Sequence, residues 1–264
     1  MNENKISFII CCNDDFYIEE CYCYLDELAI PEGYEADIIE IRDAVSMTAG
    51  YNEAMGMTDA KYKVYLHQDV FLKNKNFISD LLTIFQSDKN IGMVGMVGTP
   101  YLDETGVMWK GIRFGNFYRL QECIDKKWIE NFYPVWEGIL EVEAVDGLLL
   151  ATQYDIPWRE DLFQRWDFYD ISQSFEFRKA GYMVVVAGHN PEWYIHDCGV
   201  PNMIYYNEER EKFLKEYSEY MKGRQGLTWE EYKAEVVKRI ESGFTGAEEE
   251  KERIIDSVVR CSIV

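Results

Sequence analysis

The sequence lacks any run of the roughly 20 apolar residues that a helix needs to cross a bilayer. Its first residues, MNENK, are too polar to begin a signal peptide. The seven cysteines are odd in number and lack the paired CxxC spacing of a tetrahedral zinc site, so we expect most of them to be reduced. These absences predict a cytoplasmic protein without a transmembrane segment.

Positive charge is scarce as well. The 264 residues include 27 Lys and Arg against 48 Asp and Glu, which gives a formal net charge of −21. This charge repels phosphate backbones and anionic lipids, so it argues against nucleic acid as a partner. A nucleotide diphosphate would need a bound cation, a helix N-terminus or a local basic patch to offset it. A divalent metal ion, Mn²⁺ or Mg²⁺, is therefore the expected cofactor for such a substrate.

What the sequence does contain is enough apolar surface for one large domain, with 47% hydrophobic and 15% aromatic residues. A short, continuous apolar run at residues 6–12 predicts a parallel strand covered on both faces. Helix and strand patterns then alternate along the chain, at residues 16–28, 36–41, 48–57, 63–67, 76–86 and 91–97. This alternation predicts an α/β fold with a mostly parallel, Rossmann-like sheet and flanking helices.

The middle of the chain, residues 99–141, loses this periodicity and predicts loops and a hairpin. Order returns with an apolar run at 142–152, a helix at 169–179 and a strand at 182–187. We expect a helical tail to follow these elements.

The tail, from residue 207, is strongly charged, with apolar positions at three- and four-residue spacing. Thr228 and Glu231 form the pattern of a helix capping box. We therefore predict a main domain at residues 1–206 and a helical extension at 207–264. Because its apolar stripes need a partner, we expect the extension to pack on the domain or to form a homodimer contact.

In parallel sheets, ligands bind beyond the carboxyl ends of the strands. The segment LHQDV delivers His67 and Asp69 to that edge, where a carboxylate can hold Mg²⁺ or Mn²⁺ against a diphosphate. The alternative is that Asp69 only caps the following turn. Further along, His196 follows a strand-like segment and can complete a metal site with Asp69, although a lone histidine is more often structural.

Two more pairs of residues are candidates for chemistry. Asp146 and Gly147 interrupt an apolar run, where a carboxylate needs a partner or a ligand. Gly147 permits either the close approach of a substrate or a bend in a strand. Asp167 and Asp170 stand just before a helix, so either can cap the helix while the other acts as the general base for an acceptor hydroxyl.

In this order and at these separations, the features resemble glycosyltransferase family 2. The matching segments span about residues 5–200 and are ISFIICCND, SMTAGYNEAM, YLHQDV, VDGLLLAT, RWDFYDISQSFEFRKAGYMVVV and IHDCG. They look most like a branch of bacterial family-2-like proteins that includes a streptomycin-cluster member. The resemblance implies a GT-A-type fold and an inverting hexosyltransferase. Its donor would be a nucleotide-diphosphate sugar, and its acceptor a saccharide or small-molecule hydroxyl.

The resemblance also implies roles for individual residues. Asp69 would hold the divalent cation, with His196 as a second ligand. Asp170 would be the catalytic base, with Asp167 as its rival. The substrate-binding residues implied in the same way are Asn13, Asp43, Asn52, Asp146, Gly147 and Trp166.

Two departures from the family pattern leave alternatives open. The segment His67-Gln68-Asp69 has one carboxylate where the family motif has two, and Tyr169-Asp170 replaces Glu-Asp. The first departure favours an inactive module that only binds nucleotide sugars or proteins. A nucleotidyltransferase is the other alternative, although the segment CCNDDFY lacks the Gly-rich, basic loop that such enzymes usually carry.

Overall fold

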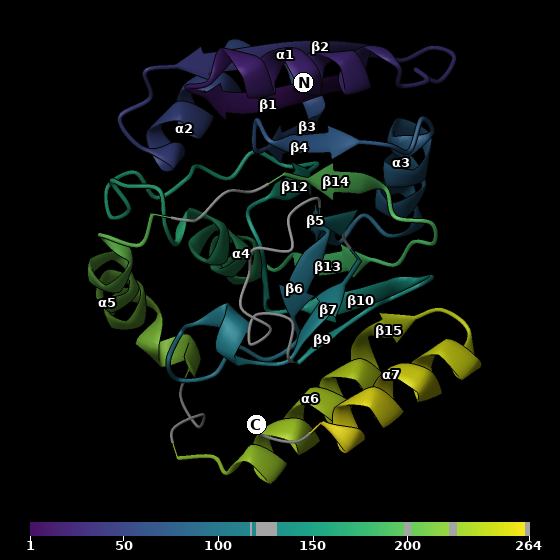
Figure 1. Cartoon of the computed structure of the whole chain (residues 1–264), viewed down its shortest axis with the longest axis vertical. Coiled ribbons are helices and arrows are strands. Elements are labelled where there is room, and N and C mark those ends of the chain that lie inside the picture. Colours follow the sequence, from purple (N-terminus) through teal and green to yellow (C-terminus); the bar gives the residue numbers. More distant parts are fainter. Residues whose placement is uncertain (117, 120–130, 198–201, 222–225, 262–264) are drawn as a thin grey trace.

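The computed structural model describes residues 1–116, 118–119, 131–197, 202–221 and 226–261. Within these residues, eight strands form the main sheet (Figure 1): β1 (Asn2–Cys12), β2 (Glu35–Arg42), β3 (Ala60–Leu66), β5 (Ile91–Gly95), β10 (Ile139–Val142), β12 (Leu149–Thr152), β13 (Met183–Ala187) and β15 (Phe244–Thr245). Their order across the sheet is β15-β10-β13-β5-β12-β3-β1-β2.

Six of these eight strands run in the same direction. β1 pairs in parallel with β2 and β3, and β5 pairs in parallel with β13. β12 lies antiparallel between β3 and β5, and β10 lies antiparallel between β13 and β15. The strands are thus mostly parallel in direction, as the sequence predicts, and β12 and β10 are the reversed members.

Helices cover both faces of this sheet. Successive residues of a strand point to opposite faces, and alternate residues of β1 accordingly pack in two different buried clusters. The first cluster includes residues of α1 (Asp15–Asp26) and α3 (Phe77–Ser87). The second includes residues of α2 (Met47–Met57) and α4 (Tyr169–Lys179). This double cover explains why the second part of β1, residues 6–12, is an almost continuous apolar run.

The other described strands form two smaller sheets, ordered β11-β6-β7-β9 and β4-β14-β8. The remaining elements of this part are β4 (Val70–Leu72), β6 (Val97–Thr99), η1 (Met108–Lys110), β7 (Arg113–Gly115), β8 (Tyr118–Arg119), β9 (Phe132–Tyr133), β11 (Ala144–Val145) and β14 (Tyr194–His196). The apolar run at 142–152 is therefore divided, because residues 146–148 separate β11 from β12. β6 and β7 are consecutive antiparallel strands in the region predicted as loops and a hairpin, of which residues 117 and 120–130 lie outside the described part.

The C-terminal extension packs on the rest of the chain. Its elements are α5 (Tyr206–Tyr217), η3 (Ser218–Met221), α6 (Trp229–Gly243), β15 and α7 (Glu248–Arg260). Thr228 and Glu231 form the predicted capping box. Phe213 of α5 packs against Phe168 and Phe175, and apolar residues of α6 and α7 join the second buried cluster. A homodimer through these helices and a domain boundary at residue 206 stay predictions.

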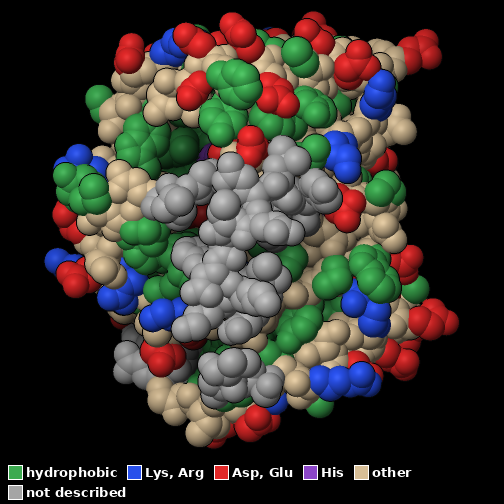
Figure 2. All heavy atoms as spheres, viewed as in Figure 1, with side chains coloured by type: hydrophobic (Ala, Val, Ile, Leu, Met, Phe, Trp, Pro, Cys, Tyr) green, Lys and Arg blue, Asp and Glu red, His purple; other side chains and the backbone are tan. Residues whose placement is uncertain are grey.

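The excess of acidic residues is visible on the surface of the molecule (Figure 2), and the cysteines that the structure describes are free thiols. Figure 2 shows acidic side chains gathered along the upper edge of the molecule, over α1 and β2. Among the described residues, no helix has both the length and the apolar character that a bilayer crossing requires. The free thiols of the described part are Cys11, Cys12, Cys21, Cys23 and Cys261, as predicted, and Cys123 and Cys198 lie outside it.

Candidate functional site

A pocket of about 580 Å³ lies where β1, β2 and β3 end. Because these strands are parallel, their carboxyl ends meet at one edge of the sheet, which is where folds of this class bind ligands. The pocket is lined by Cys11, Cys12, Asn13, Ile41, Asp43, Ala44, Met47, His67, Gln68, Asp69, Trp166 and Asn202. Four predicted site residues are therefore brought together here: Asn13, Asp43, Asp69 and Trp166.

Hydrogen bonds join the ends of β1 and β3 at this pocket. The backbone N–H groups of Asn13 and Asp14 donate to Gln68 Oε1 over 2.9 and 3.1 Å, and Gln68 Nε2 donates to Asn13 Oδ1 over 2.8 Å. After β2, Asp43 has a φ of 58°, a left-handed conformation that few non-glycine residues adopt. Such backbone strain clusters at functional sites. The side chain of Gln68 thus holds the segments that follow β1 and β3 together beside the pocket.

The pocket carries negative charge without a compensating cation. Asp43 and Asp69 are acidic, and none of the described residues that line the pocket is Lys or Arg. Arg42, at the end of β2, is already paired with Asp15 and Glu40. An anionic ligand in this pocket therefore needs a bound cation more than it would in a basic cleft.

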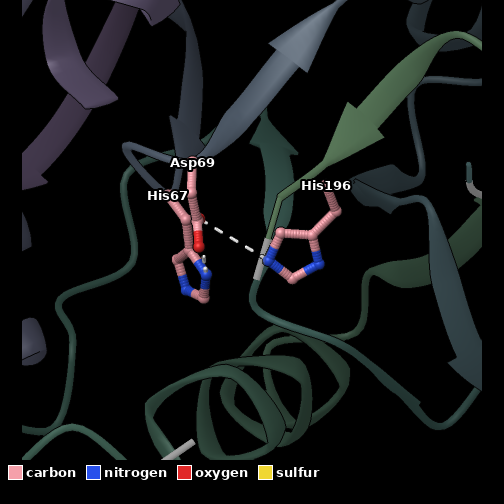
Figure 3. Close-up of side chains that lie close together, drawn as sticks. All are labelled: His67, Asp69 and His196. Atoms are coloured by element: carbon pink, nitrogen blue, oxygen red, sulfur yellow. Dashed lines mark ion pairs between the residues drawn. The ribbon is translucent and has the colours of Figure 1, made fainter. Parts of the chain in front are cut away.

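Three side chains that could bind a metal ion converge at the end of β3 (Figure 3). His196 Nε2 lies 3.5 Å from Asp69 Oδ1, and His67 Nδ1 lies 4.0 Å from the same oxygen. The three candidate ligand atoms lie within 4.8 Å of one another. Antiparallel pairing of β14 with β4 places His196 opposite Val70, which brings it beside Asp69. The structure thus brings Asp69 and His196 together, as predicted, and adds His67.

The chemistry of this cluster fits a divalent cation. Asp69 Oδ1 is buried, and its contacts with His196 Nε2 at 3.5 Å and His67 Nδ1 at 4.0 Å are too long for good hydrogen bonds, an arrangement that is costly unless a ligand completes it. Burial opposes the charge of Asp69, but His196 and His67 outweigh it and hold the pKa of this carboxyl below its usual value. Burial lowers the pKa of His67. An ionised carboxylate and a neutral imidazole are the forms that bind metal ions.

Tyr169, the first residue of α4, orients His67. Its hydroxyl lies 2.5 Å from His67 Nε2, which leaves Nδ1 as the ring nitrogen nearest to Asp69. A Cβ at Gly147 would overlap the Tyr169 hydroxyl, so only glycine admits the phenol at this point. The structure therefore gives Gly147 a packing role, and Gly147 does not line the pocket.

Asp170 lies in an environment suited to proton transfer. Its Oδ2 accepts a hydrogen bond from Gly147 N and its Oδ1 accepts one from Ile171 N, each over 2.8 Å. Burial, together with the negative charge of Asp146, raises the pKa of Asp170 to about 7. A carboxylate with this pKa is well matched to accepting a proton at neutral pH. His67, Tyr169, Gly147 and Asp170 thus form a continuous series of contacts.

The capping role considered for Asp167 and Asp170 is wrong. Phe168 occupies the N-cap of α4, with a φ of 60° and no side-chain cap bond. Asp170 lies inside the first turn and Asp167 precedes the cap. Burial and the charge of Glu209 raise the pKa of Asp167 to about 6, so Asp167 stays a rival base. A bulky residue with positive φ between the two aspartates is a second strained position at this site.

The predicted site residues that lie outside the pocket lining are Asn52, Asp146, Gly147, Asp167, Asp170 and His196. Asn52, like Gly147, makes a structural contact, and its role in substrate binding stays a prediction. Its Oδ1 accepts from Trp158 N over 2.8 Å and its Nδ2 donates to Trp158 O over 2.9 Å. Both ends of the amide are thus used to hold the segment that leads to α4.

The sequence does not predict the roles of two residues at the site. These are His67 as a metal ligand and Tyr169 as the residue that orients His67. The signal for His67 is its position two residues before Asp69 at the end of the same strand. No local signal marks Tyr169, because its contact with His67 joins residues 102 positions apart.

The chain belongs to a family of glycosyltransferases. Residues 7–217 match the family described as "Glycosyltransferase like family". None of the curated proteins matches the chain in sequence. Membership in the predicted streptomycin-cluster branch stays a prediction.

A solved structure of a mannosyltransferase shares the fold. The mannosyltransferase PcManGT from Pyrobaculum calidifontis, in complex with GDP-Man and Mn²⁺, has a TM-score of 0.50 and 11% identity, over 96% of this chain and 79% of its own. S. aureus TarS has a TM-score of 0.47 and 12% identity, over 97% of this chain and 43% of TarS. This chain therefore spans less than half of the TarS length. At such identities the likeness to PcManGT shows the fold alone, which is the GT-A-type α/β fold predicted from the sequence.

Proposed function

We propose that this protein is a metal-dependent, inverting glycosyltransferase that moves a sugar from a nucleotide-diphosphate sugar to an acceptor hydroxyl. The observation that carries the proposal is the pocket at the strand ends, where a buried carboxylate oxygen of Asp69 lies between two histidines that could bind a metal ion with it. With no Lys or Arg among the described lining residues, this pocket suits a diphosphate bound together with a cation. The absence of Lys and Arg among the described lining residues also argues against a nucleotidyltransferase with a basic phosphate loop.

The residues that would hold Mn²⁺ or Mg²⁺ are Asp69, His196 and His67. When bound, the ion neutralises the charge that develops on the leaving diphosphate. Asn13 and Asp43 line the same pocket and are placed to contact the nucleotide.

Trp166 offers an exposed ring at the pocket for the sugar or the acceptor. Asp170 is the proposed general base that takes the proton from the acceptor hydroxyl, because its pKa of about 7 is tuned to that task. The neighbouring charge of Asp146 helps to keep this pKa high. One displacement at the anomeric carbon then inverts its configuration, and no covalent nucleophile is needed.

The comparisons support this proposal at the level of family and fold. The related folds include proteins solved with GDP-Man and Mn²⁺ and with UDP-GlcNAc. We propose that the donor of this protein is likewise a nucleoside diphosphate sugar and that the acceptor is a saccharide or small molecule.

Hydrolysis of nucleotide sugars tests the proposal directly. GDP-mannose, UDP-glucose and UDP-N-acetylglucosamine would each be incubated with the full chain and Mn²⁺, with and without a chelator. The nucleoside diphosphate released, GDP or UDP, would then be measured. An active transferase leaks sugar slowly to water, so we expect release that requires the metal and is lost in Asp69→Asn. Thermal stabilisation by a nucleotide sugar without any release would instead identify a binding module.

A further inference from the structure

A second cavity, of about 330 Å³, lies among residues to which the proposed reaction gives no role. It is lined by Asn116, Phe132, Pro134, Trp136, His189, Asn190 and Glu192. None of these residues lines the larger pocket. Asn116 directly follows β7, while the other residues come from β9 and the residues after it and from the segment that follows β13. Figure 1 labels these three strands. The volume is at the lower end of the range for small-molecule sites, about 300 to 1,000 Å³.

One wall of this cavity is an aromatic ring held in a fixed orientation. Trp136 is 47% exposed, although its backbone N–H donates to Glu250 Oε1 over 2.8 Å. The guanidinium of Arg253 lies 3.9 Å from the centre of its ring, and Arg253 is itself bonded to Glu250 and to the carbonyl of Pro134. An exposed ring that is already immobilised can stack on a ligand at a small cost in conformational entropy.

A second wall contains a buried polar atom without a partner. His189 is only 4% exposed, and its Nε2 makes no hydrogen bond. Its Nδ1 lies 3.3 Å from Trp193 N and 3.4 Å from Pro191 O. Burial lowers the pKa of His189 to about 4, so the ring is neutral at physiological pH. In one tautomer Nε2 is a free donor and in the other a free acceptor, and a ligand hydroxyl can satisfy either.

The charges around the cavity select a neutral ligand. Glu192 lines the cavity and repels phosphate or carboxylate groups, while the nearby cation, Arg253, is already paired with Glu250. The neutral ring of His189 offers no charge to an anion. A sugar ring combines an apolar face for an indole with hydroxyls for imidazole and carboxylate groups, so it matches all three walls.

We propose that this cavity binds a neutral saccharide, with a sugar ring stacked on Trp136 and a hydroxyl bonded to His189 Nε2. This binding does not depend on transfer at the larger pocket. Its test therefore needs no measurement of activity.

The test begins with the full chain on an array of neutral oligosaccharides, followed by calorimetry with the oligosaccharide that is retained best. Trp136→Ala should weaken its binding by about tenfold or more, as expected for a central aromatic contact, and Trp136→Phe by less. Tyr220→Ala is the matched control, because Tyr220 is 50% exposed and lies elsewhere on the surface, in η3. We expect this control to bind like the wild type.

His189 provides a second variant. His189→Gln keeps a side chain that can bond a hydroxyl, so it should retain more affinity than His189→Leu at an equal thermal midpoint. The proposal is overturned if the array retains no neutral oligosaccharide, or if Trp136→Ala binds as tightly as the wild type. It is also overturned if Trp166→Ala, at the larger pocket, abolishes binding while Trp136→Ala does not.

Discussion

Asp69 and Asp170 lie at the two ends of the proposed site, and their surroundings move their pKa values in opposite directions. Asp69, beside the pocket, faces two histidines that lower its pKa. Asp170, in the first turn of α4, is desolvated beside Asp146, and its pKa rises to about 7. An aspartate side chain is therefore kept ionised at position 69, whereas at position 170 it has a pKa suited to exchanging a proton.

This difference assigns the two aspartates to different tasks. A carboxylate that stays ionised over a wide pH range is suited to holding a cation. A carboxylate with a pKa near neutrality is suited to general-base catalysis. The regions are joined through His67 and Tyr169, so a change in one can be tested for its effect on the other.

Asp170→Asn should have the largest effect. Loss of the general base should lower kcat by about a hundredfold or more while donor affinity stays nearly unchanged. An amide has one acceptor oxygen where Asp170 bonds two backbone N–H groups, so the substitution should also cost about 1 kcal/mol of stability. Steady-state kinetics and thermal unfolding check both expectations. Full activity in Asp170→Asn together with an inactive Asp167→Asn would move the base to Asp167.

Asp69→Asn should act on binding, because the amide removes the charge that attracts a hard cation. We expect the affinity for a nucleoside diphosphate in the presence of Mn²⁺ to fall by about tenfold to a hundredfold, by analogy with losses at metal sites. Calorimetry with UDP or GDP, with and without Mn²⁺, measures the change. Equal affinities for the two proteins with Mn²⁺ would remove Asp69 from the metal site.

Tyr169→Phe tests the connection between the two regions. Removal of the hydroxyl that orients His67 should weaken Mn²⁺ binding by about tenfold, the lower limit for partners of metal ligands. Tyr51→Phe is a matched control, because Tyr51 is buried nearby and its hydroxyl has no partner. Titration of Mn²⁺ by electron paramagnetic resonance distinguishes the variants. Identical Mn²⁺ affinities in both variants would mean that Tyr169 is only part of the core.

The pH dependence should give the smallest effect. The folded pKa of Asp170, about 7, lies above the usual value of about 4, so the bound proton stabilises the fold. That stability is fully present below about pH 4 and is lost as the pH rises through about 7. Unfolding at several pH values should show a steeper decline in the wild type than in Asp170→Asn. Parallel curves would contradict the raised pKa.

Much of the fold could be predicted because its signals are local. The helix expected at 169–179 has those bounds in the structure, and Thr228 caps α6 as its pattern indicates. The placement of Asn13, Asp43 and Asp69 around one pocket follows from the parallel direction of β1, β2 and β3. Periodicity, capping and the alternation of helices and strands are all visible over short windows of sequence.

What could not be predicted depends on contacts between distant segments. The reversed direction of β12 is set by its pairing with β3 and β5, and an apolar run carries no sign of direction. The three-residue cluster of His67, Asp69 and His196 forms because β14 pairs with β4 and brings His196 beside the end of β3. The contact of Asn52 with Trp158 could not be predicted for the same reason, since the two residues are 106 positions apart.

The short strand β15 has a consequence for self-association. It pairs with Ile139 and Leu140 of β10 and so covers part of one outer edge of the main sheet. The opposite edge, β2, carries Glu35, Asp37 and Glu40. An open strand edge can recruit a strand from another molecule, and like charges or a covering segment prevent this. One edge is thus covered by pairing and the other carries acidic side chains, so a chain shortened before β15, which also loses α7, should aggregate more readily.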